Sequence, residues 1–143
     1  MSTSTYTLEQ NESYARIDWK AQELIQANYE ELEQVIRLLF KKEYANIILN
    51  LGQVTDLDGY GVSAIRKGTK ICTNELGLFA IVSKNEGIQD RLDQAKIENL
   101  TLLNTVQEAI DAIYLNDLEN DFEDGSEEED EYGSDFTEAG EDY

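Results

Sequence analysis

Two continuous apolar runs with a helical pattern between them constrain the fold of this chain more than any other feature. The runs are NIILNL (46–51) and LFAIVS (78–83), and polar or turn residues flank each of them. A short run of this kind predicts a strand that is buried on both faces. Between the runs, Val62, Ile65 and Cys72 recur at helical spacing. A strand–helix–strand crossover with parallel strands is therefore expected.

Shorter patterns add three more strands. Residues 5–10 and 13–19 each alternate apolar and polar side chains on either side of Asn11-Glu12, which predicts a hairpin. The segment NLTLL (99–103) is a short, mostly apolar run, so it predicts the last strand.

Capping signals place the remaining helices. Asn28 is expected to cap the first helix, Ser83 with Glu86 the third, and Thr105 with Glu108 the fourth. The predicted fold class is α/β, with a mixed β-sheet and four helices in the order ββαβαβαβα.

The acidic residues are distributed unevenly along the chain. Residues 117–143 contain fourteen of the 31 acidic residues and no Lys or Arg, so residues 1–116 contain the other 31 − 14 = 17 acids and all 11 bases. A segment so charged and so poor in aliphatic residues buries too little apolar surface to offset the entropy of ordering. The expected organisation is a folded domain at 1–116 and a disordered acidic tail at 117–143. The tail could mimic a polyanion, compete for a basic surface of a partner, or keep the protein dispersed.

Composition excludes several classes of function. A net charge of −20 disfavours nucleic acid and anionic membranes as direct ligands. The chain has no histidine and one cysteine, Cys72, which argues against histidine-based nucleophile systems, a disulfide and a zinc cluster. Neither a membrane span nor a signal peptide is expected, so the predicted location is the cytoplasm, with no cofactor and no metal.

The segment VTDLDGYGVS (54–63) lies where a parallel sheet usually places its functional loops. Gly59-x-Gly61-x-x-Ala64 formally matches a dinucleotide-binding motif, but about seven residues separate it from the preceding strand, where the motif needs a tight turn. We expect Gly59 and Gly61 to allow backbone angles that other residues resist. Asp58 is expected to N-cap the second helix.

The same segment resembles the centre of a calcium-binding loop only superficially. When Asp56-x-Asp58-Gly59 is aligned on its glycine, the first and last ligand positions fall on Val54 and Ile65, which cannot ligate calcium. Acid–base catalysis by Asp56, Asp58 and the phenol of Tyr60 is a further hypothesis, although no histidine accompanies them.

The element order and two segments resemble the STAS domain of the bacterial anti-sigma factor antagonists, over about residues 4–114. ELIQANYEELEQVI (23–36) is similar to that family's entry into its first helix. NIILNLGQVTDLDGYGVSAI (46–65) is similar to its strand, its V-x-x-x-D-S-S/T-G loop and its next helix. The resemblance implies a domain that captures an anti-sigma factor, and so frees a sigma factor, until a partner kinase phosphorylates the loop.

Residue by residue, Asp58 matches the family's aspartate and Gly61 its glycine. Gly59 falls on the first serine and Tyr60 on the phosphoacceptor, while Val62 takes the usual leucine position. A tyrosine places its hydroxyl several ångströms farther out than a serine does, so the phosphorylation switch is not expected in its usual form. Tyr60 could instead anchor an interface or pack over the edge of the sheet.

The sequence therefore predicts a non-catalytic, protein-binding regulator of the anti-sigma factor antagonist type, whose partner is an anti-sigma factor or serine kinase. The alternative is a phosphorylation-independent scaffold subunit of a signalling complex. The protein is expected to be a monomer or a weak homodimer. Phosphorylation is considered at Ser63 and at Tyr60. The predicted partner-binding residues are Asp56, Asp58, Gly59, Tyr60, Gly61 and Ser63.

Overall fold

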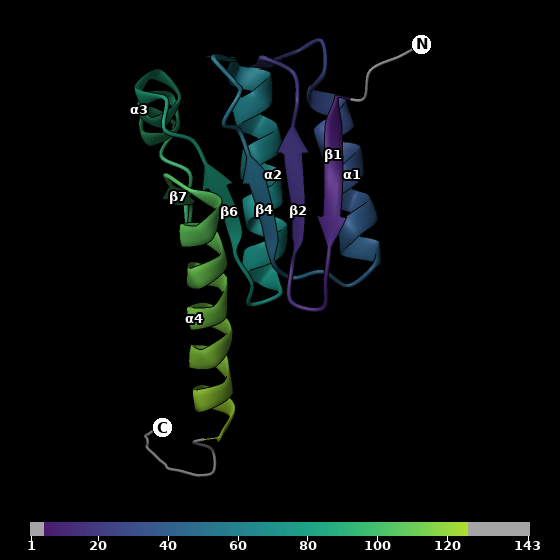
Figure 1. Cartoon of the computed structure of the whole chain (residues 1–143), viewed down its shortest axis with the longest axis vertical. Coiled ribbons are helices and arrows are strands. Elements are labelled where there is room, and N and C mark those ends of the chain that lie inside the picture. The colour runs from purple at the N-terminus through teal and green to yellow at the C-terminus, as the bar shows by residue number, and fades with distance from the viewer. Residues whose placement is uncertain (1–4, 126–143) are drawn as a thin grey trace. The chain divides into compact units, whose positions relative to one another are not determined.

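A five-stranded mixed sheet in the order β1-β2-β4-β6-β7 forms the centre of the domain (Figure 1). The computed structural model describes residues 5–125. The strands of this sheet are β1 (Tyr6–Gln10), β2 (Ala15–Trp19), β4 (Ile47–Asn50), β6 (Phe79–Val82) and β7 (Thr101–Leu103). The helices are α1 (Tyr29–Lys41), α2 (Gly59–Asn74), α3 (Glu86–Ala95) and α4 (Val106–Gly125). The predicted fold class, α/β with a mixed sheet and four helices, is confirmed.

The predicted hairpin forms the antiparallel edge of the sheet. β1 and β2 pair with Tyr6 opposite Trp19 and Gln10 opposite Ala15. The alternation along β2 buries Ala15, Ile17 and Trp19 on one face, as a half-buried strand requires. From β2 onward all neighbouring strands run parallel.

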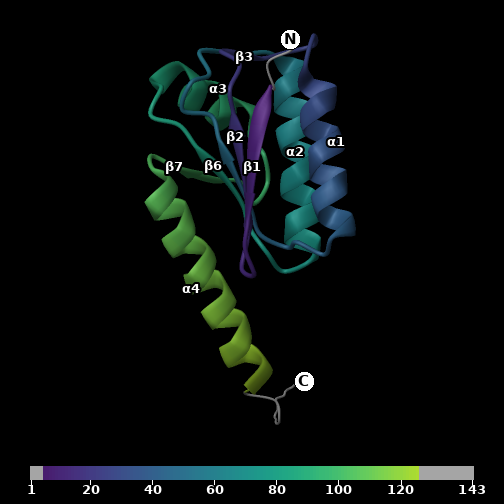
Figure 2. The same cartoon turned by 45° about the vertical axis from the view of Figure 1, so that its right-hand side comes forward.

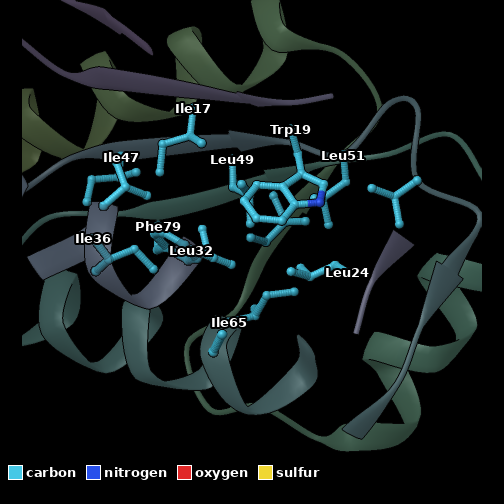
Figure 3. Packing of buried hydrophobic residues seen from close by; sticks show 14 of the residues in the cluster. Ile17, Trp19, Leu24, Leu32, Ile36, Ile47, Leu49, Leu51, Ile65 and Phe79 are labelled. Carbon is cyan, nitrogen blue, oxygen red and sulfur yellow. The ribbon is translucent and has the colours of Figure 1, made fainter. Parts of the chain in front are cut away.

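The main core fills the space between the sheet and α1 and α2, which pack side by side on one face (Figure 2). The apolar face of α1 is fully buried and consists of Leu32, Val35, Ile36 and Leu39. Figure 3 shows Trp19 and Leu49 of the sheet in the same cluster as Ile65 of α2. The indole Nε1–H of Trp19 donates to the carbonyl of Glu23 (2.9 Å), so the buried ring leaves no unsatisfied donor.

The first two turns of α4 cover part of the opposite face. Ala109 and Ile113 pack in one buried cluster with Ile48, Ala80 and Val82 of the sheet. The chain divides into two compact units after Ile113. None of the helices between residues 5 and 125 is a candidate membrane span.

Two capping predictions need correction. The N-cap of α3 is Asn85, whose Oδ1 accepts from the N–H of Ile88 (3.1 Å); Ser83 lies before it, and its Oγ accepts from the N–H of Asn85. Asn28 occupies the predicted N-cap position of α1, but its Oδ1 accepts from the N–H of Ile25, outside the helix.

The capping prediction for α4 is confirmed. Thr105 Oγ1 accepts from the N–H of Glu108, and the Glu108 carboxylate accepts in turn from the N–H of Asn104. The reciprocal pair therefore satisfies two backbone donors at the start of this helix.

The predicted tail differs from the structure at its beginning. Disorder was expected from Asp117 onward, whereas α4 continues through Asp117 to Gly125. Residues 106–113 form a helix packed on the sheet, so the nucleus from which the following residues extend already exists. The rest of the predicted tail, 126–143, lies outside the described residues.

Candidate protein-binding site

A small second sheet, absent from the predicted element order, supports the 56–63 loop. β3 (Glu23–Leu24) pairs in parallel with β5 (Asp56–Leu57), with Glu23 opposite Asp56 and Leu24 opposite Leu57. Leu24 and Leu57 are buried, which anchors both strands to the core. The pairing holds the loop before α2 beside the segment that leads into α1.

Both carboxylate oxygens of Asp58 accept backbone hydrogen bonds that stabilise this arrangement. Oδ1 accepts from the N–H of Gly61 (3.0 Å), which makes Asp58 the N-cap of α2 as predicted. Oδ2 accepts from the N–H of Gln26 (2.9 Å), 32 residues away in sequence. One side chain therefore caps a helix and ties the 56–63 loop to the β3–α1 connection.

The electrostatics of Asp58 follow from these contacts. Desolvation opposes ionisation, but the backbone N–H groups of Gly61, Gln26 and Tyr60, with the charge of Arg91, outweigh it and lower the pKa of the carboxyl. Arg91, on α3, also donates from Nε to the carbonyl of Leu57 (3.3 Å). Arg91 was missed from sequence because nothing in the local pattern of α3 signals a contact with a loop 34 residues earlier.

The two glycines of the loop have different roles, and neither adopts a positive φ, so the predicted reason for them is wrong. A Cβ on Gly61 would clash with the carbonyl oxygen of Leu24 and would lie 2.6 Å from Leu57 Cδ1. Gly61 is therefore a site of close packing between α2 and β3. A Cβ on Gly59 would meet no atom within 4 Å.

Tyr60 protrudes at the start of α2 and is 45% exposed. Its ring lies against that of Tyr29, the first residue of α1, with centroids 5.2 Å apart and planes tilted by 45°. The two rings form an aromatic pair that joins the first turns of the two helices. The sequence did not indicate this pair because 31 positions separate its members.

The other predicted site residues differ in their exposure to solvent. Asp56 is exposed on β5, and Ser63 is half-buried in the second turn of α2. The structure therefore brings Asp56, Asp58, Tyr60 and Ser63 onto one loop and helix start.

Comparisons with known proteins identify the family. The family model of the STAS domain matches residues 20–109, which include the small sheet, the loop and α1 to α3. A comparison with curated proteins gives no match.

Solved structures share the fold. An anti-sigma factor antagonist from Mycobacterium paratuberculosis aligns with a TM-score of 0.65 at 17% identity, covering 77% of this chain and 93% of its own. The anti-sigma factor antagonist SpoIIAA in its unphosphorylated form aligns with a TM-score of 0.61 at 18% identity, covering 76% and 97%. The phosphorylated form of this Bacillus cell fate determinant aligns with a TM-score of 0.60 at 18% identity, covering 76% and 98%. With a family match over residues 20–109, a mixed sheet in the expected order and the loop in the expected place, this chain belongs to the STAS domain family.

Proposed function

We propose that this STAS domain is a non-catalytic regulator that binds an anti-sigma factor or its kinase in the cytoplasm and thereby controls sigma-factor-dependent transcription. The 56–63 loop and the exposed face of α2 form the contact surface. The family and its solved relatives, which include anti-sigma factor antagonists, support a protein-binding role.

The aromatic pair, in which Tyr60 is exposed and Tyr29 half-buried, is the observation on which this proposal rests most directly. Tyr60 presents a large ring with a polar tip, and such residues are enriched among those that dominate binding energy. Tyr29 packs against one side of the ring. Asp58, which accepts two backbone hydrogen bonds, holds the backbone next to it. A rigid anchor loses little conformational entropy when it is buried by a partner.

The state of Asp58 supports a role other than catalysis. Both of its oxygens accept backbone hydrogen bonds, and its pKa is lowered, which makes it a poor proton acceptor near neutral pH. Its contacts position the loop, and that is the role we assign to it.

Phosphorylation-independent binding is the second candidate, and the identity of residue 60 favours it. The family's acceptor position holds Tyr60, which a Ser/Thr kinase does not modify, and Gly59 precedes it. Ser63 lies beyond the first turn of α2, where the field of the helix N-terminus has fallen off. A scaffold that stays bound regardless of kinase activity fits this arrangement.

Affinity measurements with the host's purified anti-sigma factor test the binding surface. Tyr60→Ala is expected to weaken binding by about tenfold or more, because truncation of a central aromatic anchor costs roughly 2 kcal/mol. Leu38→Ala is the matched control, since Leu38 is equally exposed, at 45%, but lies on α1 outside the loop. Equal affinities for the wild type and Tyr60→Ala would refute the proposed surface.

Intact mass after incubation with the host's STAS-directed kinases separates the two candidates. A phosphorylation-independent scaffold gains no phosphate, and its affinity for the partner does not change. A phosphate on Ser63 or Tyr60 that lowers the affinity would restore the switch and exclude the scaffold.

A further inference from the structure

We propose that the segment of α4 from Tyr114 to Asp121 is a second docking surface, and that its occupant is a basic amphipathic helix of another protein. The segment presents three large apolar side chains to solvent. Tyr114 is 50% exposed, Leu115 61% and Leu118 52%. This proposal does not depend on the 56–63 loop.

These three side chains form a stripe along the helix. Positions 114 and 118 are four residues apart and positions 115 and 118 three apart, so all three lie on one side of the helix. An apolar stripe at this spacing is what one helix presents to another when the two pack in a partner complex. Its exposure in the isolated chain marks a surface available for binding.

The charges around the stripe select the kind of partner. Residues 114–125 contain five acidic residues and no basic one, and residues 126–143 contain nine acidic residues and no basic one. A partner helix whose apolar face is flanked by Lys and Arg can pack on the apolar stripe, and its basic side chains attract the surrounding acidic residues. A second copy of this chain, with its own charge of −20, is repelled, as is an anionic membrane.

A basic partner would also stabilise this part of α4. Asp117 and Asp121 are four residues apart, and like charges at this spacing destabilise a helix. The last turn holds acidic and no basic residues, which opposes the helix dipole. Cations from a bound helix would relieve both effects, so binding is expected to increase the helix content of this segment.

The surface lies outside the family domain. The family match ends at residue 109, before the stripe begins. The two forms of SpoIIAA align over 97–98% of their length with only 76% of this chain, so about a quarter of this chain has no counterpart in them. The segment can therefore give this STAS domain a partner in addition to the one that binds the 56–63 loop.

A pair of synthetic peptides tests the proposal on the full-length chain. The first is a fluorescent peptide of about fifteen Leu and Lys residues with leucines at i, i+3 and i+4, and the second is a scrambled peptide of the same composition without an apolar face. Fluorescence anisotropy at about 0.15 M salt, where long-range attraction is screened, gives both affinities. The amphipathic peptide is expected to bind at least about tenfold more tightly than the scrambled one, because only it buries the leucines.

Variants locate the binding. Leu115→Ser/Leu118→Ser is expected to abolish the preference for the amphipathic peptide, whereas Leu38→Ser on α1 should retain it. Circular dichroism and thermal unfolding verify that both variants fold. Removal of residues 126–143 should weaken the binding of both peptides and preserve the ratio of their affinities, because only the electrostatic contribution to binding is lost.

Three results would overturn the proposal. Equal affinity for the two peptides would mean that charge attraction alone accounts for their binding. A preference that survives Leu115→Ser/Leu118→Ser would place the binding elsewhere. A homodimer seen by sedimentation equilibrium, and dissolved by the same double substitution, would make a second copy the occupant.

Discussion

The Asp58→Ala substitution tests how the loop is held in place. It removes two hydrogen bonds, one from the N–H of Gly61 and one from that of Gln26. Loss of an N-cap side chain costs about 1 kcal/mol, and loss of the second bond costs about 1 kcal/mol more. The expected loss in the free energy of unfolding is about 2 kcal/mol, which corresponds to about 8 °C in Tm for a domain of this size.

Urea denaturation followed by tryptophan fluorescence measures this loss. Trp19 is the single tryptophan and is buried in the core, so its emission reports unfolding of the STAS domain. Asp58→Asn is the matched variant, because an amide has one acceptor oxygen and can keep only one of the two bonds. Its expected loss is about half as large. A loss below about 0.5 kcal/mol for Asp58→Ala, or equal losses for Asp58→Ala and Asp58→Asn, would refute the explanation that Asp58 holds the loop through two hydrogen bonds.

The pH dependence provides a second readout. The folded-state pKa of Asp58 lies below the unfolded value of 3.8, so the contribution of its charge is complete above pH 3.8. It is lost as the pH falls through the folded pKa. The difference in stability between the wild type and Asp58→Asn should therefore be constant near neutrality and shrink below about pH 4.

Three further predictions concern the packing of two glycines and the burial of Cys72. Gly61→Ala should destabilise the domain by about 2 kcal/mol or more in urea denaturation, because its Cβ meets the backbone of Leu24. Gly59→Ala should be neutral or stabilising by up to about 0.5 kcal/mol, since its Cβ meets open space; equal effects of the two substitutions would contradict the packing explanation. Burial raises the pKa of the Cys72 thiol to about 12, so a thiol reagent should leave the folded protein unmodified at mildly alkaline pH and modify it in urea. Rapid reaction of the folded protein would contradict the burial.

Hydrophobic periodicity was sufficient to predict the main sheet and the position of its helices. The i, i+3, i+4 spacing of Leu32, Val35 and Ile36 predicts a buried helix face, and all three are buried in α1. The apolar runs at 46–51 and 78–83 contain β4 and β6 in parallel register. These features are local, so a single sequence reveals them.

Features that depend on distant contacts were not predictable in this way. β3 and β5 have two residues each, too few to show any periodicity, and they exist because Leu24 and Leu57 are both anchored in the core. The bond between Asp58 and Gln26 joins parts of the chain that only the fold brings together.

The extent of α4 was missed for another reason. Composition predicts that residues 117–143 bury little apolar surface, but helix propagation from a packed segment requires only that the helix already exist. Asp117 therefore continues a helix that its own neighbours in sequence would not have nucleated.

The footprint of a bound partner tests the central claim, that this STAS domain binds through the loop before α2. Hydrogen–deuterium exchange of the chain alone and in complex with the host's anti-sigma factor measures the protection of each backbone segment. The largest decrease in exchange rate on binding is expected in residues 56–66 and in the first turn of α1, around Tyr29 and Tyr60. Protection confined to other parts of the chain, with residues 56–66 exchanging as in the free protein, would contradict the claim.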